Sequence, residues 1–316
     1  MHARTETTNR NPPKMDEIRI GQINLARSRV ATEEIAKYAI QNGLDVLQIQ
    51  EPYTHKDRVT GLGTGIKIAQ AEHGTPWVAV AILRDDFTVV HLEHTTTTRI
   101  ACIHLSTEDI RINLVSLYCK VSRAATSDMR RSFRELSNAL KQINEDGVIV
   151  GMDANAKSTT WHSNNSDVRG RKLEEFIAQN GLRVINREQE QSTFQVTCGE
   201  SNIDVTLTRG CRNIAISNWT VMDGVTQSDH NLITFTIRST RNNLRIEPNT
   251  TEMPSLRFRI DERRSKQLRA RIVADLTGSN AEPRNVEEID KAVEKLTKAI
   301  LKACTGTFRL AEKTDS

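Results

Sequence analysis

Residues 228–237 read Ser-Asp-His-Asn-Leu-Ile-Thr-Phe-Thr-Ile, so a carboxylate and an imidazole stand directly before an apolar alternation. The alternation of Ile233, Phe235 and Ile237 is the period-two pattern of a strand with one face in a core. Because an unpaired charge beside a buried strand is costly, Asp229 and His230 predict polar partners elsewhere in the chain. Candidates stand at the ends of other predicted strands. They are Asn24, Glu51, Tyr118, Asp153, Asn155 and Asp204.

Upstream, strands and helices are expected in alternation. Residues 17–24 and 45–50 read as strands, and the helix between them is expected to be capped by Thr32 and stopped by Gly43. Residues 65–118, rich in Val, Ile and Thr, predict a sheet meander. Each strand of the opening strand-helix-strand unit closes on an oxygen-bearing side chain, which is typical of an α/β enzyme.

The second half continues this alternation. A helix capped by Ser127 is expected from apolar residues spaced three and four apart, and a second helix is expected before Gly181. Short strands are predicted at 148–153, 182–186, 203–207 and after His230, and an amphipathic helix at 285–304 with Asn285 and Glu288 as a capping box.

Composition limits the function classes. The 316 residues with 37% hydrophobic content support a substantial core. Up to Thr240 there are 28 basic and 28 acidic residues, against 16 basic and 12 acidic after it, so the excess of +4 lies in the tail. Net charge therefore gives the first part no general attraction for a polyanion. Five scattered cysteines favour neither a zinc site nor a disulfide framework, and no apolar run predicts a signal peptide or membrane span. An intracellular protein is expected.

The candidate ligands predict a hard divalent metal ion. Glu51 and Asp229 offer carboxylate oxygens, and Asn24 and Asn155 offer amide oxygens, a mixture that suits Mg²⁺ or Mn²⁺ better than zinc. With one imidazole beside it, such a site has what phosphoryl transfer needs: charge stabilisation and an oriented water molecule. No organic cofactor is required.

Each of these pieces has a plainer interpretation when taken alone. An Asp-x-Asn sequence such as 153–155 is common in Asx turns, and Glu51 before a proline can be an exposed strand end. His230 can be a core histidine with its hydrogen bonds satisfied. Asp204 within an apolar strand is harder to explain without a partner. The order and spacing of the set favour a site.

Taken in order, the motifs resemble the endonuclease/exonuclease/phosphatase superfamily, and most of all the endonuclease domain of insect non-LTR retrotransposons that insert into ribosomal genes or telomeric repeats. The resemblance covers residues 17–240. Its phrases are Gln22-Ile23-Asn24-Leu25, Arg27-Ser28-Arg29-Val30-Ala31-Thr32, Gln50-Glu51-Pro52-Tyr53, Val115-Ser116-Leu117-Tyr118-Cys119, Gly151-Met152-Asp153-Ala154-Asn155-Ala156, Trp161-His162-Ser163, Asp167-Val168-Arg169-Gly170, Ser192-Thr193-Phe194, Ile203-Asp204-Val205-Thr206-Leu207 and Ser228-Asp229-His230.

The resemblance implies a four-layered α/β sandwich of the DNase type, with two packed mixed sheets flanked by helices. It also implies separate roles for the site residues. Glu51 would be the principal ligand of Mg²⁺ or Mn²⁺, with Asp229 assisting and Asn24 supporting the metal or the scissile phosphate. Asp153 would activate the water molecule, and Asp204 would hold His230 protonated. Asn155 and Tyr118 would contact the phosphate.

Two departures from the family pattern stand out. Ala26 replaces an acidic residue of the repair-type relatives, which puts a second metal site in doubt, and Cys119-Lys120-Val121 replaces the usual prolines. Basic residues near the motifs are expected to contact DNA, with a solvated helix face or an ordinary hairpin as the alternatives. They are Arg27, Arg29, Arg123, Arg130, Arg209 and Arg212. Arg169 is expected to tie loops together, and Trp161 to pack in the core.

The function that follows is a divalent-metal-dependent nuclease that nicks double-stranded DNA and leaves a 3′-hydroxyl primer for reverse transcription by a downstream region, with action in the nucleus. The alternatives are a phosphatase or phosphodiesterase, an apurinic/apyrimidinic repair nuclease, and an inactive DNA-binding remnant. The expected organisation is a disordered leader at 1–16, an endonuclease domain at 17–240, and a polar linker with a helical tail at 241–316, the start of a truncated downstream region.

Overall fold

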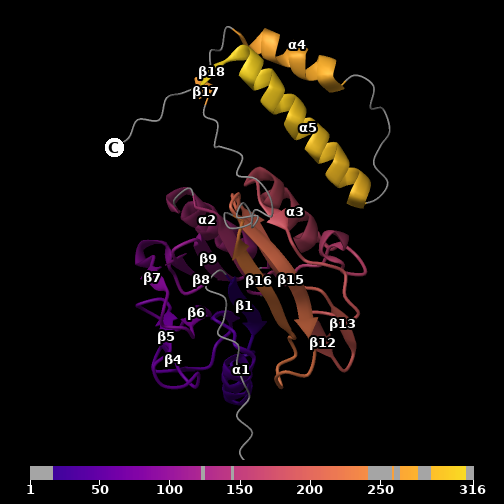
Figure 1. Cartoon of the computed structure of the whole chain (residues 1–316). Coiled ribbons are helices and arrows are strands. Elements are labelled where there is room, and N and C mark those ends of the chain that lie inside the picture. The colour runs from indigo at the N-terminus through magenta and orange to yellow at the C-terminus, as the bar shows by residue number, and fades with distance from the viewer. Residues whose placement is uncertain are drawn as a thin grey trace, which may run out of the picture. The chain divides into compact units, whose positions relative to one another are not determined.

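The computed structural model of the protein describes residues 17–121, 125–143, 146–240, 258–259, 264–276 and 286–310. The chain forms two compact units, Met1–Ile246 and Glu247–Ser316. The first unit contains the two large sheets and every predicted site residue. Figure 1 gives the labels of the elements.

Two six-stranded mixed sheets form the first unit (Figure 1). In each sheet one pair of neighbours is parallel, β1 with β2 and β9 with β10, and the other neighbours are antiparallel. The first sheet has the order β15 (Ile214–Met222), β16 (Leu232–Ser239), β1 (Glu17–Asn24), β2 (Val46–Gln50), β6 (Val78–Ile82) and β5 (Lys67–Ala69). The second has the order β11 (Arg183–Val184), β14 (Asp204–Arg209), β10 (Val148–Asp153), β9 (Arg111–Tyr118), β8 (Ile100–Ser106) and β7 (Thr88–His91).

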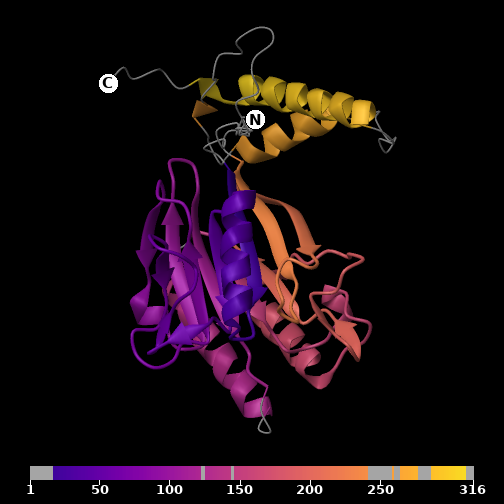
Figure 2. The same ribbon diagram turned by 90° about the horizontal axis from the view of Figure 1, so that it is seen from below.

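Helices cover the outer face of each sheet. The helix α1 (Arg29–Asn42) packs Ile35 and Ala39 against the first sheet, and Figure 2 shows it lying lengthwise over the strands. The helices α2 (Ala125–Gln142) and α3 (Val168–Gln179) cover the second sheet through residues such as Leu136 and Leu173. A third apolar cluster fills the space between the sheets. The four-layered α/β fold expected from the sequence is therefore confirmed.

The helix ends correct two expectations. The N-cap of α1 is Ser28, whose hydroxyl accepts from the backbone N–H of Ala31, while Thr32 is buried and donates its hydroxyl to the Ser28 carbonyl. Thr32 is therefore one turn inside the helix and is not its cap. Ser127 likewise lies inside α2, which begins at Ala125. Gly43 ends α1 in the left-handed conformation, as expected.

Three buried glutamines, Gln22, Gln48 and Gln50, join the two sheets; we call them the glutamine seam. They project from β1 and β2 of the first sheet and donate hydrogen bonds to acceptors on β9 and β10 of the second. The donor–acceptor distances are 3.3 Å from Gln22 Nε2 to Met152 O, 2.8 Å from Gln48 Nε2 to Val115 O, and 2.9 and 3.1 Å from Gln50 Nε2 to Ser116 Oγ and Gly151 O. Directional bonds thus supplement the apolar contacts between the sheets.

Glycine is needed where β10 passes under the glutamine seam. A Cβ atom on Gly151 would lie 2.7 Å from Gln48 Oε1 and 2.9 Å from Gln22 Oε1, closer than real Cβ contacts. The absence of a side chain at Gly151 lets the two sheets approach within hydrogen-bonding distance at this point.

Several elements were not predicted. The small antiparallel pairs β3 (Thr54–His55) with β4 (Arg58–Val59) and β12 (Phe194–Val196) with β13 (Gly199–Ser201) lie in segments for which no element was predicted. The strand β15 was also not predicted; it begins two residues after Arg212, one of the arginines expected to contact DNA.

The second unit consists of α4 (Ser265–Leu276), α5 (Val286–Thr307) and the pair β17 (Phe258–Arg259) with β18 (Arg309–Leu310). The helix α5 was expected, whereas α4 was not. Asn285, the predicted capping residue of α5, lies outside the described residues, as do residues 1–16 and 241–257.

Among the described helices, none has the length and apolar content that crossing a membrane requires.

Candidate active site

The predicted site residues meet where strands of both sheets end. Asn24 ends β1 and Glu51 follows β2, and these parallel strands pair Asn24 with Gln50. In the second sheet Tyr118 ends β9, Asp153 ends β10, and Asp204 begins β14. The register pairs Asp153 with both Tyr118 and Asp204. Each sheet thus supplies about half of the site.

Asn24 joins the two halves. Its fully buried side chain donates from Nδ2 to Glu51 Oε2 at 3.2 Å and to Asp153 Oδ2 at 2.8 Å. Its Oδ1 accepts from the backbone N–H of Ala26, which fixes the orientation of the amide. One amide therefore holds two carboxylates from different sheets close together.

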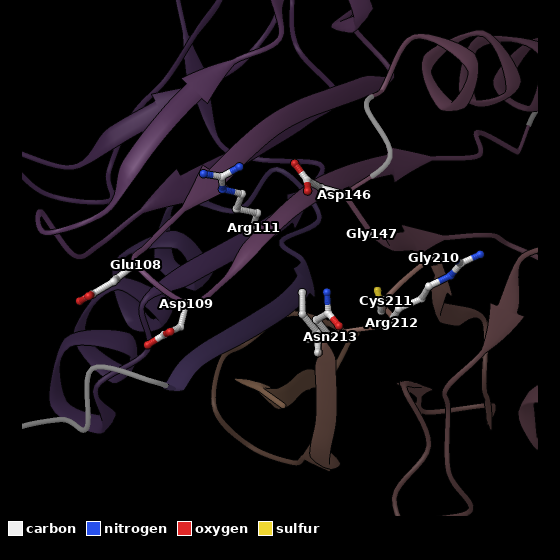
Figure 3. Close-up of a pocket in the computed structure, with 10 residues that line it drawn as sticks. Glu108, Asp109, Arg111, Asp146, Gly147, Gly210, Cys211, Arg212 and Asn213 are labelled. Carbon is white, nitrogen blue, oxygen red and sulfur yellow. The ribbon is translucent and has the colours of Figure 1, made fainter. Parts of the chain in front are cut away.

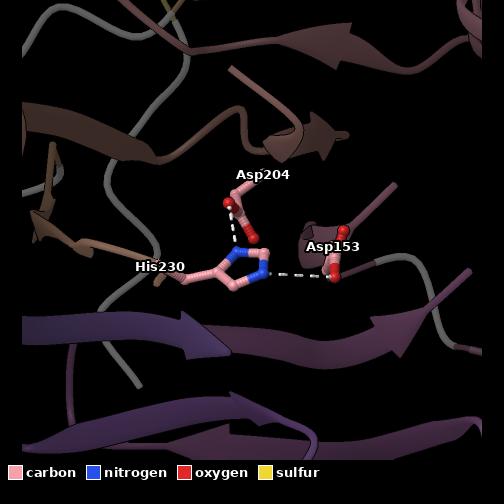
Figure 4. Close-up of side chains that lie close together, drawn as sticks. All are labelled: Asp153, Asp204 and His230. Carbon is pink, nitrogen blue, oxygen red and sulfur yellow. Dashed lines mark hydrogen bonds and ion pairs between the residues drawn. The ribbon is translucent and has the colours of Figure 1, made fainter. Parts of the chain in front are cut away.

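His230 lies between two aspartates, as Figure 4 shows. Its Nδ1 is 2.9 Å from Asp204 Oδ2, and its Nε2 is 3.9 Å from Asp153 Oδ2. Asp153 also accepts from the backbone and side-chain amides of Asn155, at 2.9 and 3.0 Å. Asp204 Oδ1 is buried and has no hydrogen-bond partner within the described part of the chain.

The charges of this group support proton transfer near neutral pH. Burial opposes the charged form of His230, but the charge and hydrogen bond of Asp204, with Asp153 and Glu51, raise its pKa to about 9. Burial and the charge of Asp204 raise the pKa of Asp153 to about 7, against the lowering effect of His230 and Asn24. Near neutral pH, His230 is thus a cation and Asp153 is poised to exchange a proton.

Tyr118 is a hydrogen-bond donor at this site. Burial, followed by the charges of Glu51 and Asp153, raises the pKa of its phenol. The group therefore keeps its proton and can donate to an anionic oxygen.

Ser228 links the turn that carries His230 to β1. Its hydroxyl donates to the Asn24 carbonyl at 2.7 Å and accepts from the His230 N–H at 3.2 Å. Phe194 supports the other side of His230 with an edge contact at 4.8 Å between ring centroids. Both residues fix the position of the imidazole.

Comparisons with known proteins show the family to which this chain belongs. A family model described as endonuclease-reverse transcriptase matches residues 112–234. The solved endonuclease domain of TRAS1, a telomere-specific non-LTR retrotransposon, is 30% identical to this chain, with a TM-score of 0.63. The match covers 71% of this chain and 99% of that domain. The chain belongs to the family of non-LTR retrotransposon endonuclease domains.

Curated relatives of the retrotransposon endonuclease family are much longer than this chain. A 115 kDa protein of the type-1 retrotransposable element R1DM of Drosophila melanogaster is 27% identical over 228 residues, which are 69% of this chain and 22% of that protein. A Pol polyprotein of element R1 from Bradysia coprophila is 29% identical over 189 residues, 56% of this chain and 18% of the polyprotein. The chain thus spans about a fifth of the length of these relatives.

The same fold occurs in a more distant nuclease. The apurinic/apyrimidinic endonuclease LMAP of Leishmania major matches with 12% identity and a TM-score of 0.57, over 75% of this chain and 92% of that one. At this identity the likeness concerns the fold alone.

The residues fit the divalent metal ion that the endonuclease family implies. Asp153, Asp204 and His230 offer ligand atoms within 4.8 Å of one another, a spacing at which a metal can bind. A protonated imidazole is not a ligand, however, and Asp204 already occupies Nδ1 of His230. The carboxylate of Glu51, one-fifth exposed and adjacent to Asn24, is the more suitable oxygen donor.

Asp229 has an exposed side chain, unlike the other predicted ligands. Its backbone carbonyl accepts from Gln195, and within the described residues no hydrogen bond or ion pair of its carboxylate is found. Its role as a metal ligand stays a prediction.

The predicted DNA-contacting arginines are dispersed over the endonuclease domain. Arg27 lies at the site, 3.8 Å from Glu51, whereas Arg29 pairs with Glu33 on α1 and Arg130 is exposed on α2. Arg123 lies outside the described residues.

Two of the predicted arginines lie at the opposite end of β14 from Asp204. Arg209 donates to the carbonyls of Leu140 and Asn180 at 2.8 and 3.4 Å, so its side chain braces the ends of α2 and α3. Arg212 lines a cavity of about 280 Å³ beside Asp146 (Figure 3). The structure does not bring Arg209 and Arg212 together with the residues of the candidate site.

Arg169 ties the loops of the site together, as expected. Its guanidinium donates to the carbonyls of Asn155, Ala154 and Cys119 at 2.6, 3.1 and 3.0 Å. Trp161, also as expected, is fully buried and donates to the Ala156 carbonyl. The loop that carries Asn155 is therefore held from the start of α3.

Gly170→Ala is expected to destabilise the domain by about 1–3 kcal/mol, because the start of α3 has no room for a side chain. A Cβ atom there would lie 1.8 Å from the Lys157 carbonyl oxygen, and moving α3 would displace Arg169. Urea denaturation measures the change, with the exposed neighbour Arg171→Ala as the control. Equal stability of the two variants would contradict the packing described.

Proposed function

We propose that this chain is a divalent-metal-dependent endonuclease that nicks double-stranded DNA, with residues 17–240 as the catalytic domain. The observation that carries the proposal is the arrangement of a protonated His230, held by Asp204, facing Asp153 at 3.9 Å. A base and a cation within one small buried group are what hydrolysis of a phosphodiester requires.

In the proposed reaction, Asp153 accepts a proton from a water molecule while the oxygen of that water molecule forms a bond to phosphorus. The bond from phosphorus to the 3′ oxygen breaks, and that oxygen takes a proton from solvent, which leaves a 3′-hydroxyl and a 5′-phosphate. His230 stabilises the negative charge of the pentacovalent phosphate, and the hydroxyl of Tyr118 and the amide of Asn155 donate to its oxygens.

Glu51 and Asn24 would hold Mg²⁺ or Mn²⁺, with Asp229 as the remaining candidate. The ion would supply Lewis-acid stabilisation of charge on the phosphate. Glu51 is close enough for this role because Asn24 links it to Asp153 through hydrogen bonds of 3.2 and 2.8 Å.

The 3′-hydroxyl would serve as a primer for reverse transcription. This step is proposed because one relative is the Pol polyprotein of a retrotransposable element, of which this chain spans 18%. Reverse transcription itself would belong to the remainder of a longer protein, and the nick would be made in chromosomal DNA, in the nucleus.

Nicking of supercoiled plasmid tests the proposal. The wild-type chain is expected to convert supercoiled to open-circular DNA with Mg²⁺ or Mn²⁺ but not with EDTA, and a DNA polymerase is expected to extend the nick without prior end treatment. Cleavage only at an abasic site would identify a repair nuclease, and hydrolysis of inositol phosphates without DNA cleavage would identify a phosphatase.

Glu51→Gln provides the matching test for the metal. It removes one charge with little change of shape, and it is expected to abolish the rise in melting temperature that Mn²⁺ gives the wild-type chain. Glu72→Gln, an exposed carboxylate outside the site, is the control and is expected to respond like wild type.

A further inference from the structure

Trp77 lies at the edge of the catalytic group but has no place in the reaction described above. Its indole is partly exposed and stacks on the Tyr118 ring, with centroids 5.5 Å apart and an interplanar angle of 6°. Trp161 and Trp219, by contrast, are buried. Trp77 is therefore the tryptophan that can respond to a bound ligand.

Two cations lie over the indole of Trp77. The Arg27 guanidinium carbon is 3.8 Å from the ring centroid and the Lys120 ammonium nitrogen is 4.7 Å from it. These residues come from distant parts of the chain, Arg27 after β1 and Lys120 after β9. Each follows a strand that ends in a site residue, Asn24 of β1 or Tyr118 of β9, so the cations lie beside the candidate site.

Local negative charge does not balance these cations. Glu51 is 3.8 Å from Arg27 Nε, which is a loose pair, and among the described residues no carboxylate lies within ion-pair distance of Lys120. Arg27 Nη2 is buried without a hydrogen-bond partner. Two cations at 3.8 and 4.7 Å from one ring centroid, with one carboxylate loosely paired to Arg27 and an unused N–H donor, form a binding site for an anion.

The backbone holds this group in position. The Arg27 N–H donates to the Glu51 carbonyl at 2.8 Å, and the Glu51 N–H donates to the Trp77 carbonyl at 2.8 Å. Ala26, Arg27 and Glu51 all have left-handed backbone conformations, with φ of 48°, 58° and 44°. Such conformations are unfavourable for residues other than glycine and concentrate at functional sites. Here they direct Arg27 over the ring.

We propose that Arg27 and Lys120, supported by Trp77, bind a second phosphate of the DNA backbone, next to the one that is cleaved. The proposal rests on the proposed nuclease function and specifies how its substrate is held. A phosphate fits better than a base because both cations approach the indole that a base would need for stacking. Tyr118 belongs to both sites, since it is paired with Asp153 in the sheet register and its ring stacks on Trp77.

Salt-dependent binding tests the second phosphate site. A fluorescein-labelled DNA duplex is titrated with the full chain in EDTA, which prevents cleavage, at several salt concentrations. Each phosphate contact contributes about 0.9 to the slope of log Kd against log salt concentration. Arg27→Gln and Lys120→Gln are each expected to lower that slope by up to about 0.9, and Arg27→Lys to retain most of it.

The double variant Arg27→Gln/Lys120→Gln shows whether the two cations bind one phosphate or two. If both cations bind one phosphate, as proposed, the double variant lowers the slope by about 0.9 in all; a loss of about 1.8 would show two separate contacts and overturn the shared site. Trp77→Phe is expected to abolish the change of tryptophan fluorescence on DNA binding, because Trp161 and Trp219 are buried.

Matched controls distinguish a specific phosphate site from a general effect of positive charge on DNA binding. Lys67→Gln and Arg238→Gln each remove one exposed cation at the end of the first sheet remote from Asn24 and His230. If Arg27→Gln and Lys120→Gln behave like these controls while the wild-type chain nicks plasmid, the second phosphate site is wrong and the nuclease function stands. Wild-type protein that neither binds nor nicks DNA overturns both proposals.

Discussion

Asp153→Asn is expected to lower the rate of DNA nicking by about 10³- to 10⁴-fold, the upper range for loss of a general base. Asparagine has nearly the same shape but a single acceptor oxygen, so it can keep either the hydrogen bond that Asp153 Oδ2 accepts from Asn24 or the one that Oδ1 accepts from the backbone of Asn155. The main loss is the ability to take a proton from water. Initial rates of plasmid nicking in Mg²⁺ measure the effect.

Asp85→Asn is the control for Asp153→Asn, because its carboxylate is 88% exposed and lies outside the site. It is expected to nick at the wild-type rate, and circular dichroism checks that both variants are folded. A loss of less than tenfold in a folded Asp153→Asn protein would remove Asp153 from the role of base.

Asp204→Asn is expected to lower the nicking rate by about 10²- to 10³-fold and to move its pH dependence. Asp153 must be deprotonated and His230 protonated, so the wild-type rate rises as pH increases through about 7 and falls above about 9. The charge of Asp204 raises the pKa of both groups. Without the charge of Asp204, both limbs of the plot of nicking rate against pH are expected at lower pH.

The pH profile distinguishes a charge effect from a structural one. Rates of Asp204→Asn and wild type are measured from pH 5 to 10 at constant ionic strength, with the exposed Asp86→Asn as the control. A lower rate with unchanged limbs would mean that Asp204 only shapes the site. Movement of the alkaline limb toward the ordinary histidine pKa of about 6.5 supports the ion pair.

Sequence patterns predicted a helix or strand well where the hydrophobic period and the types of residue at its ends indicated the same element. Ile18 and Ile20 of β1 and the apolar stripe of α2 gave elements at nearly the observed positions. The cap of α1 was misplaced because Ser28 and Thr32 are both capable caps, and the backbone at Ala26 and Arg27 decides which one begins the helix. The glutamine seam was missed, since a glutamine in a strand ordinarily indicates a solvent-facing side.

The candidate site was predicted because its residues follow strand ends in a recognisable order. The structure adds which atoms meet, including the bridge from Asn24 to Glu51 and Asp153 and the two hydrogen bonds of Ser228. The arginines around the site follow no such order, so the sequence does not indicate which of them lie near it. Arg27 and Arg209 look alike in sequence, yet one lies over Trp77 and the other braces two helices at the far end of β14.

The glutamine seam has a mechanical consequence for how this domain meets its substrate. The proposed catalytic residues are divided between two sheets that Gln22, Gln48 and Gln50 join directly beneath them. Sliding or hinging of one sheet on the other would break several buried hydrogen bonds at once, so the two sheets are expected to keep their relative position. The adjustment needed to seat a phosphate then falls on the surface loops and on the duplex itself. Stretches of DNA that bend and untwist readily should therefore be cut in preference to stiff ones.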